Sequence, residues 1–375
     1  AYLTSTYNTG YMTGDIKGAW LSDTDDTDVT GSNLISGDAA SDDTNSTGSW
    51  VNSGMSTFES STTQAYSGTY SIHLVANSNG DAAFRDFTVE TGKTYTVTFA
   101  VYQASASQYR FAVGTGSTPN AYYNSGDVTS HNGSWKTHSV TFTATQSSAS
   151  ILIAETTSAN SCNLYIDNIS VKLADADRSV NNNGLQVNGT ITKTPVATGA
   201  DLVAYSGFST SNYLEQPYNS DLDFGTGDFS VMGWLLSSNN SDREYILERS
   251  SSGGGTTNIS VVREYTGKFQ LHVGGDMIDT SSASYNSGNY HFAMIRRSGV
   301  GYIYINGVLD GSGSMADSVT DTDATTTVGI DWAKSASGWY SRDPIALLRI
   351  SATAPTAAQI KEIYEAEKPL FQENA

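Results

Sequence analysis

The sequence predicts an all-β protein: two tandem β-sandwich modules of the jelly-roll type, an extended N-terminal arm and one short C-terminal helix. Apolar and polar residues alternate over many short runs, as they do in half-buried strands. Turn residues separate these runs at regular intervals, which is typical of a sandwich or jelly roll. A chain of 375 residues has room for two such modules, each with its own core.

We assign the first module to residues 33–173 because three runs there alternate clearly, residues 94–102, 139–143 and 164–171. The single cysteine, Cys162, directly precedes the last run, and we interpret it as a small core or edge residue. One cysteine excludes an intrachain disulfide.

The second module is expected over residues 201–371. Residues 229–236 read as a central strand, and Trp234 in their middle as a core residue. In residues 302–309 an Asn-Gly pair joins two apolar runs, which predicts a hairpin with a type I′ turn.

The chain ends with one predicted helix. Thr356 and Gln359 have the spacing of a capping box, in which both side chains bind exposed backbone N–H groups. Ile360, Ile363 and Tyr364 then form an apolar stripe at helical spacing.

Two segments lie outside these modules. Residues 1–32 contain an acidic run at 23–28 and few apolar residues, so we expect an arm, a linker or an interface strand. Its apolar residues are Tyr7, Tyr11, Ile16, Trp20 and Leu21. Residues 174–200 are expected to link the two modules.

The net charge of the chain limits the classes of partner that it is expected to bind. Acidic residues number 38 and basic residues 19, for a formal net charge of −19. Such a surface repels phosphate backbones and anionic lipids, so we expect no nucleic-acid partner and no membrane insertion. Abundant Ser, Thr, Asn and Gly with 22 tyrosines favour an outward-facing, extracellular β protein over a cytosolic catalyst.

Residues 33–38, 65–72 and 164–170 of the first module resemble the pattern of a carbohydrate-binding module of the family 4/9 jelly-roll type. Ser36 stands where that pattern has Asn, and Asn168 where it has a second Asp. The resemblance implies a polysaccharide partner and a structural Ca²⁺ held by Asp38 and Asp167. The alternative is that Asp38 caps a turn and Asp167 is a solvated strand residue.

The second module resembles the laminin-G/concanavalin-A-like lectin fold in residues 229–234, 290–297, 302–308 and 346–350. The family's "I-D-E-V-R-I" segment has lost both acids here. The ends of the chain, residues 7–28 and 363–371, are similar to stretches of tail-fibre-like virion proteins of marine tailed phages.

Catalytic motifs are missing from the sequence. Laminarinase-type relatives of the second fold carry E-x-D-x-x-E on one strand, whereas Glu244 and Glu248 lack both that spacing and the Asp. No G-x-S-x-G motif occurs either. We therefore predict that the protein is not an enzyme.

Aromatic rings that stack on sugars are the expected binding residues. The candidates are Tyr102, Tyr109, Tyr122, Tyr123 and Trp135 in the first module, and Trp332, Trp339 and Tyr340 with the polar Arg342 in the second. For each ring the alternative is a core or intersubunit contact.

These features favour a non-catalytic, glycan-binding component of a phage virion, such as a tail fibre or decoration protein that recognises host polysaccharide. One alternative is a structural assembly protein whose sandwiches pack into a homo-oligomer or against other virion proteins. Another is a secreted bacterial module that binds environmental polysaccharide.

Overall fold

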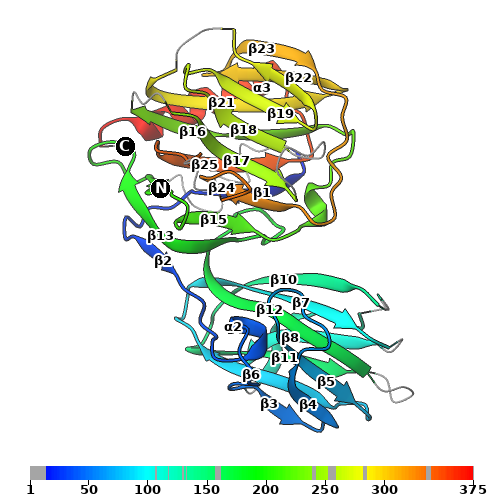
Figure 1. The fold of residues 1–375 in the computed structure, drawn as a ribbon. Helices are drawn as coiled ribbons and strands as arrows, with labels where there is room; N and C mark the ends of the chain where they lie inside the picture. Colours follow the sequence, from blue (N-terminus) through cyan, green and yellow to red (C-terminus); the bar gives the residue numbers. More distant parts are fainter. Residues whose placement is uncertain are drawn as a thin grey trace. The chain divides into compact units, whose positions relative to one another are not determined.

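The computed structural model divides the chain into two compact units. Ser32–Ala174 form the first unit, and the residues before and after them form the second (Figure 1). The structure describes residues 14–374, except 106–107, 117, 129–130, 132, 157–161, 239–241, 252–258, 282–284 and 335–338. Within these ranges no helix is long and apolar enough to cross a membrane.

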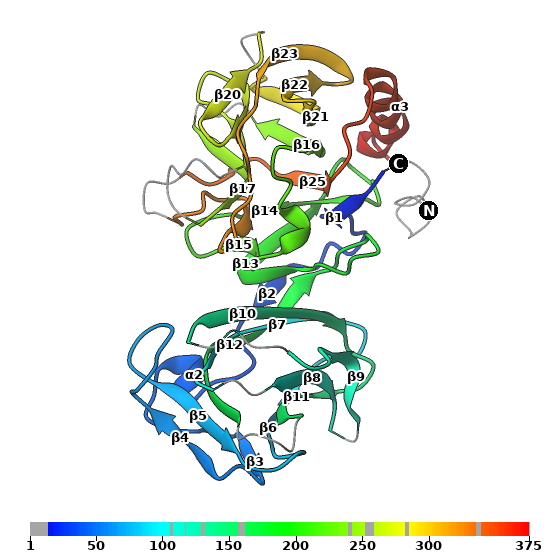
Figure 2. The same ribbon diagram turned by 90° about the vertical axis from the view of Figure 1, so that its right-hand side faces the viewer.

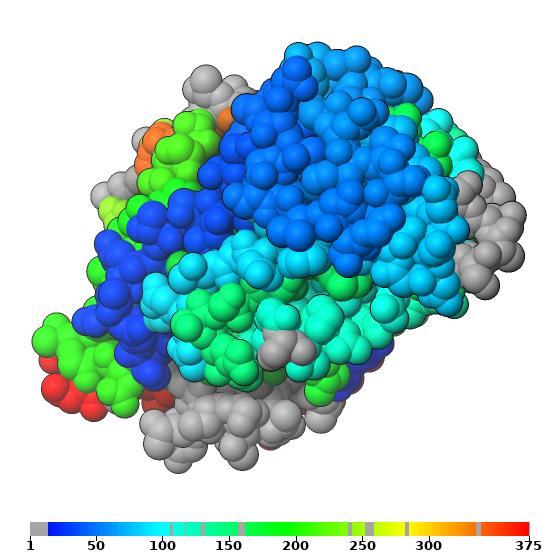
Figure 3. Space-filling model, turned by 90° about the horizontal axis from the view of Figure 1, so that it is seen from below, coloured from blue at the N-terminus to red at the C-terminus, as the bar shows by residue number. Residues whose placement is uncertain are grey.

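The first unit is a sandwich of two antiparallel five-stranded sheets (Figure 2). The sheet that we call the β12 sheet contains, in spatial order, β4 (Thr57–Ser61), β5 (Ser71–Ala76), β12 (Cys162–Asp175), β7 (Thr94–Gln103) and β10 (Trp135–Thr143). The opposite sheet contains β3 (Val51–Ser53), β6 (Ala82–Thr88), β11 (Ser148–Glu155), β8 (Tyr109–Thr115) and β9 (Thr118–Asn124). In Figure 3 the blue early strands lie beside the cyan later ones, as the β3–β6 pairing requires.

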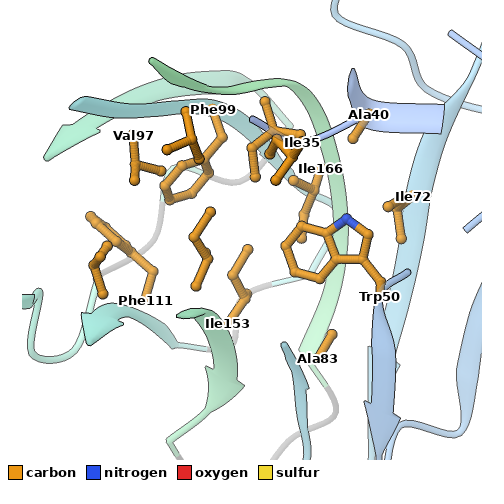
Figure 4. Close-up of a cluster of buried hydrophobic side chains, with 14 of the residues drawn as sticks. Ile35, Ala40, Trp50, Ile72, Ala83, Val97, Phe99, Phe111, Ile153 and Ile166 are labelled. Atoms are coloured by element: carbon orange, nitrogen blue, oxygen red, sulfur yellow. The ribbon is translucent and has the colours of Figure 1, made fainter. Parts of the chain in front are cut away.

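Alternation along the strands places one face of each sheet in the core of this unit. Phe99 from β7 meets Phe111 from β8 edge to face, with ring centroids 5.0 Å apart (Figure 4). Ile166 of β12 and Ile153 of β11 are fully buried between the same layers. Cys162 is buried in this cluster too, which confirms its interpretation as a core residue.

The second unit is also a sandwich. In one sheet β1 (Ile16–Trp20) and β14 (Val203–Ser206) both pair with β25 (Ile345–Ser351). On its other edge β25 pairs with β16 (Phe229–Ser238), and the sheet continues in spatial order with β21 (Ser287–Arg297), β22 (Val300–Ile305) and β23 (Val308–Ser314). In the other sheet β2 (Val29–Gly31) pairs with β13 (Leu185–Pro195), followed by β15 (Tyr213–Gln216), β24 (Thr325–Val328), β17 (Glu244–Ser250), β18 (Ile259–Arg263), β19 (Phe269–Val273) and β20 (Asp276–Asp279). Two sandwiches with one C-terminal helix confirm the predicted all-β class.

The Asn-Gly hairpin between β22 and β23 forms as its sequence predicts. Asn306 and Gly307 have φ of 51° and 77°, the positive values that a type I′ turn needs. Ile305 pairs with Val308 across the turn.

The prediction of a separate arm and linker is wrong for the part of them that the structure describes. Trp20 pairs with Leu348 in β25 and is 1% exposed, and Gly31 pairs with Gly189 in β13. These segments are strands of the second unit, because their backbone groups are satisfied by partners far away in the sequence. Tyr7 and Tyr11 lie outside the described residues.

The C-terminal helix α3 (Ala357–Glu367) begins with the predicted capping box. The backbone N–H of Thr356 donates to Gln359 Oε1 (2.8 Å), and that of Gln359 donates to Thr356 Oγ1 (3.3 Å). Its buried Ile360 and Ile363 pack against β16, β21 and β22, and the 3₁₀ turn η2 (Lys368–Phe371) follows (Figure 2).

A buried polar cluster fixes the end of this helix to the sheet. Trp234, a core residue as predicted, stacks on Phe371 at 4.1 Å and donates its Nε1–H to Glu367 Oε2 (2.6 Å). Arg349 Nη1 lies 2.6 Å from Glu367 Oε1. Fully buried His291 lies beside them, and desolvation lowers its pKa from 6.5 to about 4.

We predict that His291 makes the second unit sensitive to acid. Its imidazole stays neutral in the fold but protonates in the unfolded chain near pH 6.5. Stability that is complete above pH 6.5 is therefore lost as the pH falls toward 4, by about 3 kcal/mol at most. In urea unfolding at pH 7.5, 5.5 and 4.5, the His291→Phe variant should lose correspondingly less stability than the unmodified chain. Equal losses in the two proteins would contradict this assignment.

Candidate functional site

A row of side chains crosses all five strands of the β12 sheet in direct register. Glu59 pairs with His73, and His73 with Tyr165. Tyr165 pairs with Tyr102, and Tyr102 with Trp135. Direct cross-strand partners lie on the same face of a sheet. The four rings, which we call the aromatic row, therefore form one line across the face opposite the core.

The rings of the row contact one another continuously. His73 and Tyr165 stack with centroids 4.3 Å apart and planes inclined by 3°. Tyr102 lies 6.2 Å from Tyr165 and 5.6 Å from Trp135. Tyr66, from the loop between β4 and β5, meets Trp135 edge to face at 5.5 Å and is 48% exposed. Tyr165, in the middle of the row, is buried. Its ring therefore packs against its neighbours and supports them.

Polar groups border the row. His73 Nε2 lies 2.9 Å from Asn163 Oδ1, and its Nδ1 lies 3.6 Å from Glu59 Oε1, whose side chain is exposed. Farther along the same face, Thr98 and Ser170 share a hydrogen bond of 2.8 Å. Flat rings with amide, carboxylate and hydroxyl groups beside them can stack on sugar rings and bind their hydroxyls.

Asp167 holds the Tyr66 loop against the sheet. Its Oδ2 accepts the backbone N–H groups of Tyr66 (2.7 Å) and Ser67 (3.0 Å), and its Oδ1 accepts that of Asn168 (2.6 Å). The carboxylate is buried, and this desolvation raises its pKa despite the three hydrogen bonds. The residue is a buried loop anchor, not a solvated strand residue.

Asp38 is engaged in a similar way. Its Oδ1 accepts the N–H groups of Ala40 (2.9 Å) and Ser41 (2.8 Å), which caps helix α2 (Ala39–Asp42). Its Oδ2 forms an ion pair with Arg85, whose other guanidinium nitrogen donates to the Ser36 carbonyl (2.7 Å).

Calcium needs six to eight oxygen ligands, but at both aspartates the nearest groups are N–H donors and, at Asp38, a cation. Among the described residues no group of three acidic, His or Cys side chains could hold a metal. These N–H groups and the Arg85 guanidinium do not fit a Ca²⁺ shared by Asp38 and Asp167.

Of the five ring candidates in the first unit, the structure brings Tyr102 and Trp135 together. The prediction that Tyr109 is a binding residue is wrong, because its side chain points into the core and is fully buried. Its hydroxyl lies 2.9 Å from His131 Nε2 and 2.8 Å from His138 Nε2. Desolvation lowers the pKa of His138 to about 3 and so keeps this imidazole neutral.

Tyr122 and Tyr123 lie on β9, in the opposite sheet, and cannot join the row. Tyr122 is half-buried and stacks on Phe142 at 4.8 Å. Tyr123 is 39% exposed but rests on Phe111 at 5.4 Å.

Sequence reasoning missed His73 and Tyr165, although their alternation carried the signal. Each lies between two buried aliphatic residues, Ile72 and Leu74 around the first, Leu164 and Ile166 around the second. That position places both rings on the outer face of the sheet.

The candidates of the second unit lie between β24 and β25. Trp332 is half-buried, and its backbone N–H donates to Glu248 Oε2 (2.6 Å). Trp339 is 42% exposed and stacks on Tyr245, and the guanidinium of Arg342 lies 4.8 Å from the centre of the Tyr340 ring.

The family comparisons match the two units separately. Residues 32–161 match the model of a carbohydrate binding domain, and residues 208–361 that of the concanavalin A-like lectin/glucanases superfamily. These matches confirm the resemblances of the two halves. No curated protein sequence matches the chain.

Solved structures share only a distant likeness with the chain. Domain 4 of an extracellular arabinanase from Geobacillus stearothermophilus, in complex with arabinotriose, is 18% identical with a TM-score of 0.39, covering 50% of this chain and 92% of that one. A xylan-binding domain from Paenibacillus barcinonensis is 16% identical with a TM-score of 0.33, covering 39% of this chain and 97% of that one.

We predict that Asp167 stabilises the first unit through hydrogen bonds rather than through an ion. Asp167→Asn should lower the free energy of unfolding by about 2 kcal/mol, equally in calcium and in EDTA, because an amide cannot accept all three N–H groups. Asp127→Asn, at an exposed position, should have no effect. A calcium-dependent rise in melting temperature that Asp167→Asn abolishes would instead establish the calcium site.

Proposed function

We propose that the protein is a non-catalytic glycan-binding protein whose first unit holds a polysaccharide on the aromatic row. The observation that carries the proposal is the direct register of His73, Tyr165, Tyr102 and Trp135 across adjacent strands. The match of residues 32–161 to a carbohydrate binding domain supports it independently.

The geometry of the row suits an extended chain of sugars. Neighbouring strands are about 4.8 Å apart, so five strands present a surface long enough for several consecutive rings. Side chains on paired strands have little freedom, so little conformational entropy is lost when a ligand binds. The net charge of −19 disfavours polyanions and favours a neutral polysaccharide.

The environment of two acidic residues of the second unit, Glu244 and Glu248, supports a protein that binds glycans without hydrolysing them. A glycosidase needs two carboxylates that can reach the scissile bond. Glu244 and Glu248 are both buried, and each accepts a backbone N–H, from Arg342 (3.0 Å) and Trp332 (2.6 Å) respectively. These contacts give both acids a structural role.

The proposal includes an extracellular setting, on a phage tail fibre or decoration protein that recognises host-surface polysaccharide. It rests on the sequence-based resemblance of residues 7–28 and 363–371 to virion proteins, and these residues lie outside the ranges that the family models match. Mass spectrometry of purified particles from the source culture tests this setting, and detection of the chain in a secreted bacterial fraction alone would contradict it.

A structural assembly role is the second candidate, because edge strand β23 exposes two apolar side chains. Val308 is 67% exposed and Leu309 49%. Light scattering of the purified chain tests this role: a stable oligomer that Val308→Lys dissociates would favour it.

Within the first unit, Trp135→Ala and Tyr102→Ala should each weaken binding to a neutral polysaccharide at least tenfold, because each removes a stacking surface. Affinity electrophoresis of the full chain in gels with xylan, β-glucan, arabinan or galactomannan measures the effect. The matched control is Tyr123→Ala, an exposed ring on the opposite sheet, which should migrate like the unmodified chain. Folded protein that none of these polymers retards, or a Tyr123→Ala loss as large as that of Trp135→Ala, would refute the proposal.

A further inference from the structure

A second aromatic surface lies in the second unit, built from two segments of the chain. Trp339 stacks on the buried Tyr245 with ring centroids 6.2 Å apart and planes inclined by 21°. The guanidinium carbon of Arg243 lies 5.3 Å from the centre of Tyr245 and 5.4 Å from that of Trp339. We call these three residues the tryptophan platform.

Buried carboxylates on β17 fix the chain around this platform. Glu248 Oε2 accepts the N–H of Trp332, and its Oε1 accepts the hydroxyl of Ser260 (2.9 Å). Glu244 Oε1 accepts the N–H of Arg342 (3.0 Å), while its Oε2 lies 3.2 Å from Arg263. A desolvated carboxylate is stable only when such partners are in place, so these contacts fix the backbone at Trp332 and at Arg342, on either side of Trp339.

Backbone hydrogen bonds also join Gly329 and Asp331 to Ser341 and Trp339. The N–H of Asp331 donates to the Trp339 carbonyl (3.0 Å), and that of Ser341 to the Gly329 carbonyl (2.8 Å). Trp339 nevertheless remains 42% exposed. An exposed ring on a fixed backbone is a pre-organised binding surface, which reduces the entropic cost of holding a ligand.

The polar groups around the platform balance in charge. Arg243 lies 3.2 Å from Glu264, and Arg342 lies 3.1 Å from Asp242. Sugar hydroxyls both donate and accept hydrogen bonds. A guanidinium group can donate to them and a carboxylate can accept from them, so such pairs can bind a neutral sugar. An anionic sugar would meet two carboxylates and the overall charge of −19.

We infer that the tryptophan platform, with Asp242 and Arg342 beside it, is a second saccharide site that takes a neutral sugar ring. This goes beyond the proposed function, because it assigns the second unit a binding site of its own. A chain with two sites for the same polysaccharide gains affinity by avidity wherever both can engage one polymer.

The two sites can be followed separately in the full chain labelled with 5-fluorotryptophan. The ¹⁹F resonances of Trp135 and Trp339 are assigned by single Trp→Phe variants and report the first and the second site. The probes are neutral xylo-, cello-, laminari-, arabino- and manno-oligosaccharides. At least one of them should shift the Trp339 resonance, and the shift should persist in a Tyr102→Ala chain.

Trp339→Ala should then weaken the binding that remains in a Trp135→Ala/Tyr102→Ala chain by tenfold or more. Tyr265→Ala, which removes a 63% exposed ring elsewhere in the same unit, should leave that binding unchanged. Thermal unfolding of each variant confirms that it folds.

A Trp339 resonance that no oligosaccharide shifts would overturn the inference. If the Trp135 resonance still shifted, the proposed function would stand and only the second site would fail. If neither shifted, both would fail. Trp339→Ala that changes the oligomeric state in light scattering but not saccharide binding would assign the ring to a subunit interface, and would also overturn the inference.

Discussion

The candidate face of the first unit depends on how β12 pairs with its neighbours. Side chains alternate along a strand with a period of two, so a register shift of one residue would bury the rings and expose the core. Up to Ile166 the residues of β12 that lie in the core cluster have even numbers, whereas after a bulge they are Ile169 and Val171.

The bulge lies between Asp167 and Ser170 and includes Asn168 with φ of 51°. It inserts one extra residue, so that Asn168 and Ile169 oppose the single residue Phe99 of β7, as in a β-bulge. Asp167, the last residue before the bulge, has the same parity as Tyr165 and binds the Tyr66 loop, while the strand returns to the core beyond it. The bulge thus preserves the core on both sides of it, and the loop anchor lies immediately before it.

Buried carboxylates have a comparable role throughout the second unit. Glu367 joins the C-terminal helix to Arg349 and Trp234, while Glu244 and Glu248 bind the segment that carries Trp339. A buried acid paired in this way adds little net stability, but it strongly disfavours any arrangement that leaves the charge without its partner. Such acids therefore specify where a helix or loop lies, which local sequence propensity does not.

Much of this fold could be predicted from local patterns, because alternation, the Asn-Gly turn and the capping box involve residues close in sequence. The pairing of Trp20 with Leu348 could not, since the partners lie far apart and a short strand resembles a sparse arm. Nor does composition show that Arg85 pairs with Asp38. The sequence does indicate that Tyr109 is buried, because it alternates with the apolar residues Phe111 and Val113 and so faces the same side of its strand.

The two candidate surfaces hold exposed aromatic rings in fixed positions by different interactions. In the aromatic row, each ring is placed by backbone hydrogen bonds between strands, so the spacing of the sheet sets the spacing of the rings. On the tryptophan platform, Tyr245 belongs to β17, whereas Trp339 lies in none of the strands named above. Side-chain carboxylates there act together with backbone hydrogen bonds to fix the residues around the ring. Rings that must stay exposed cannot be held by burial, so the order has to come from the backbone beneath them.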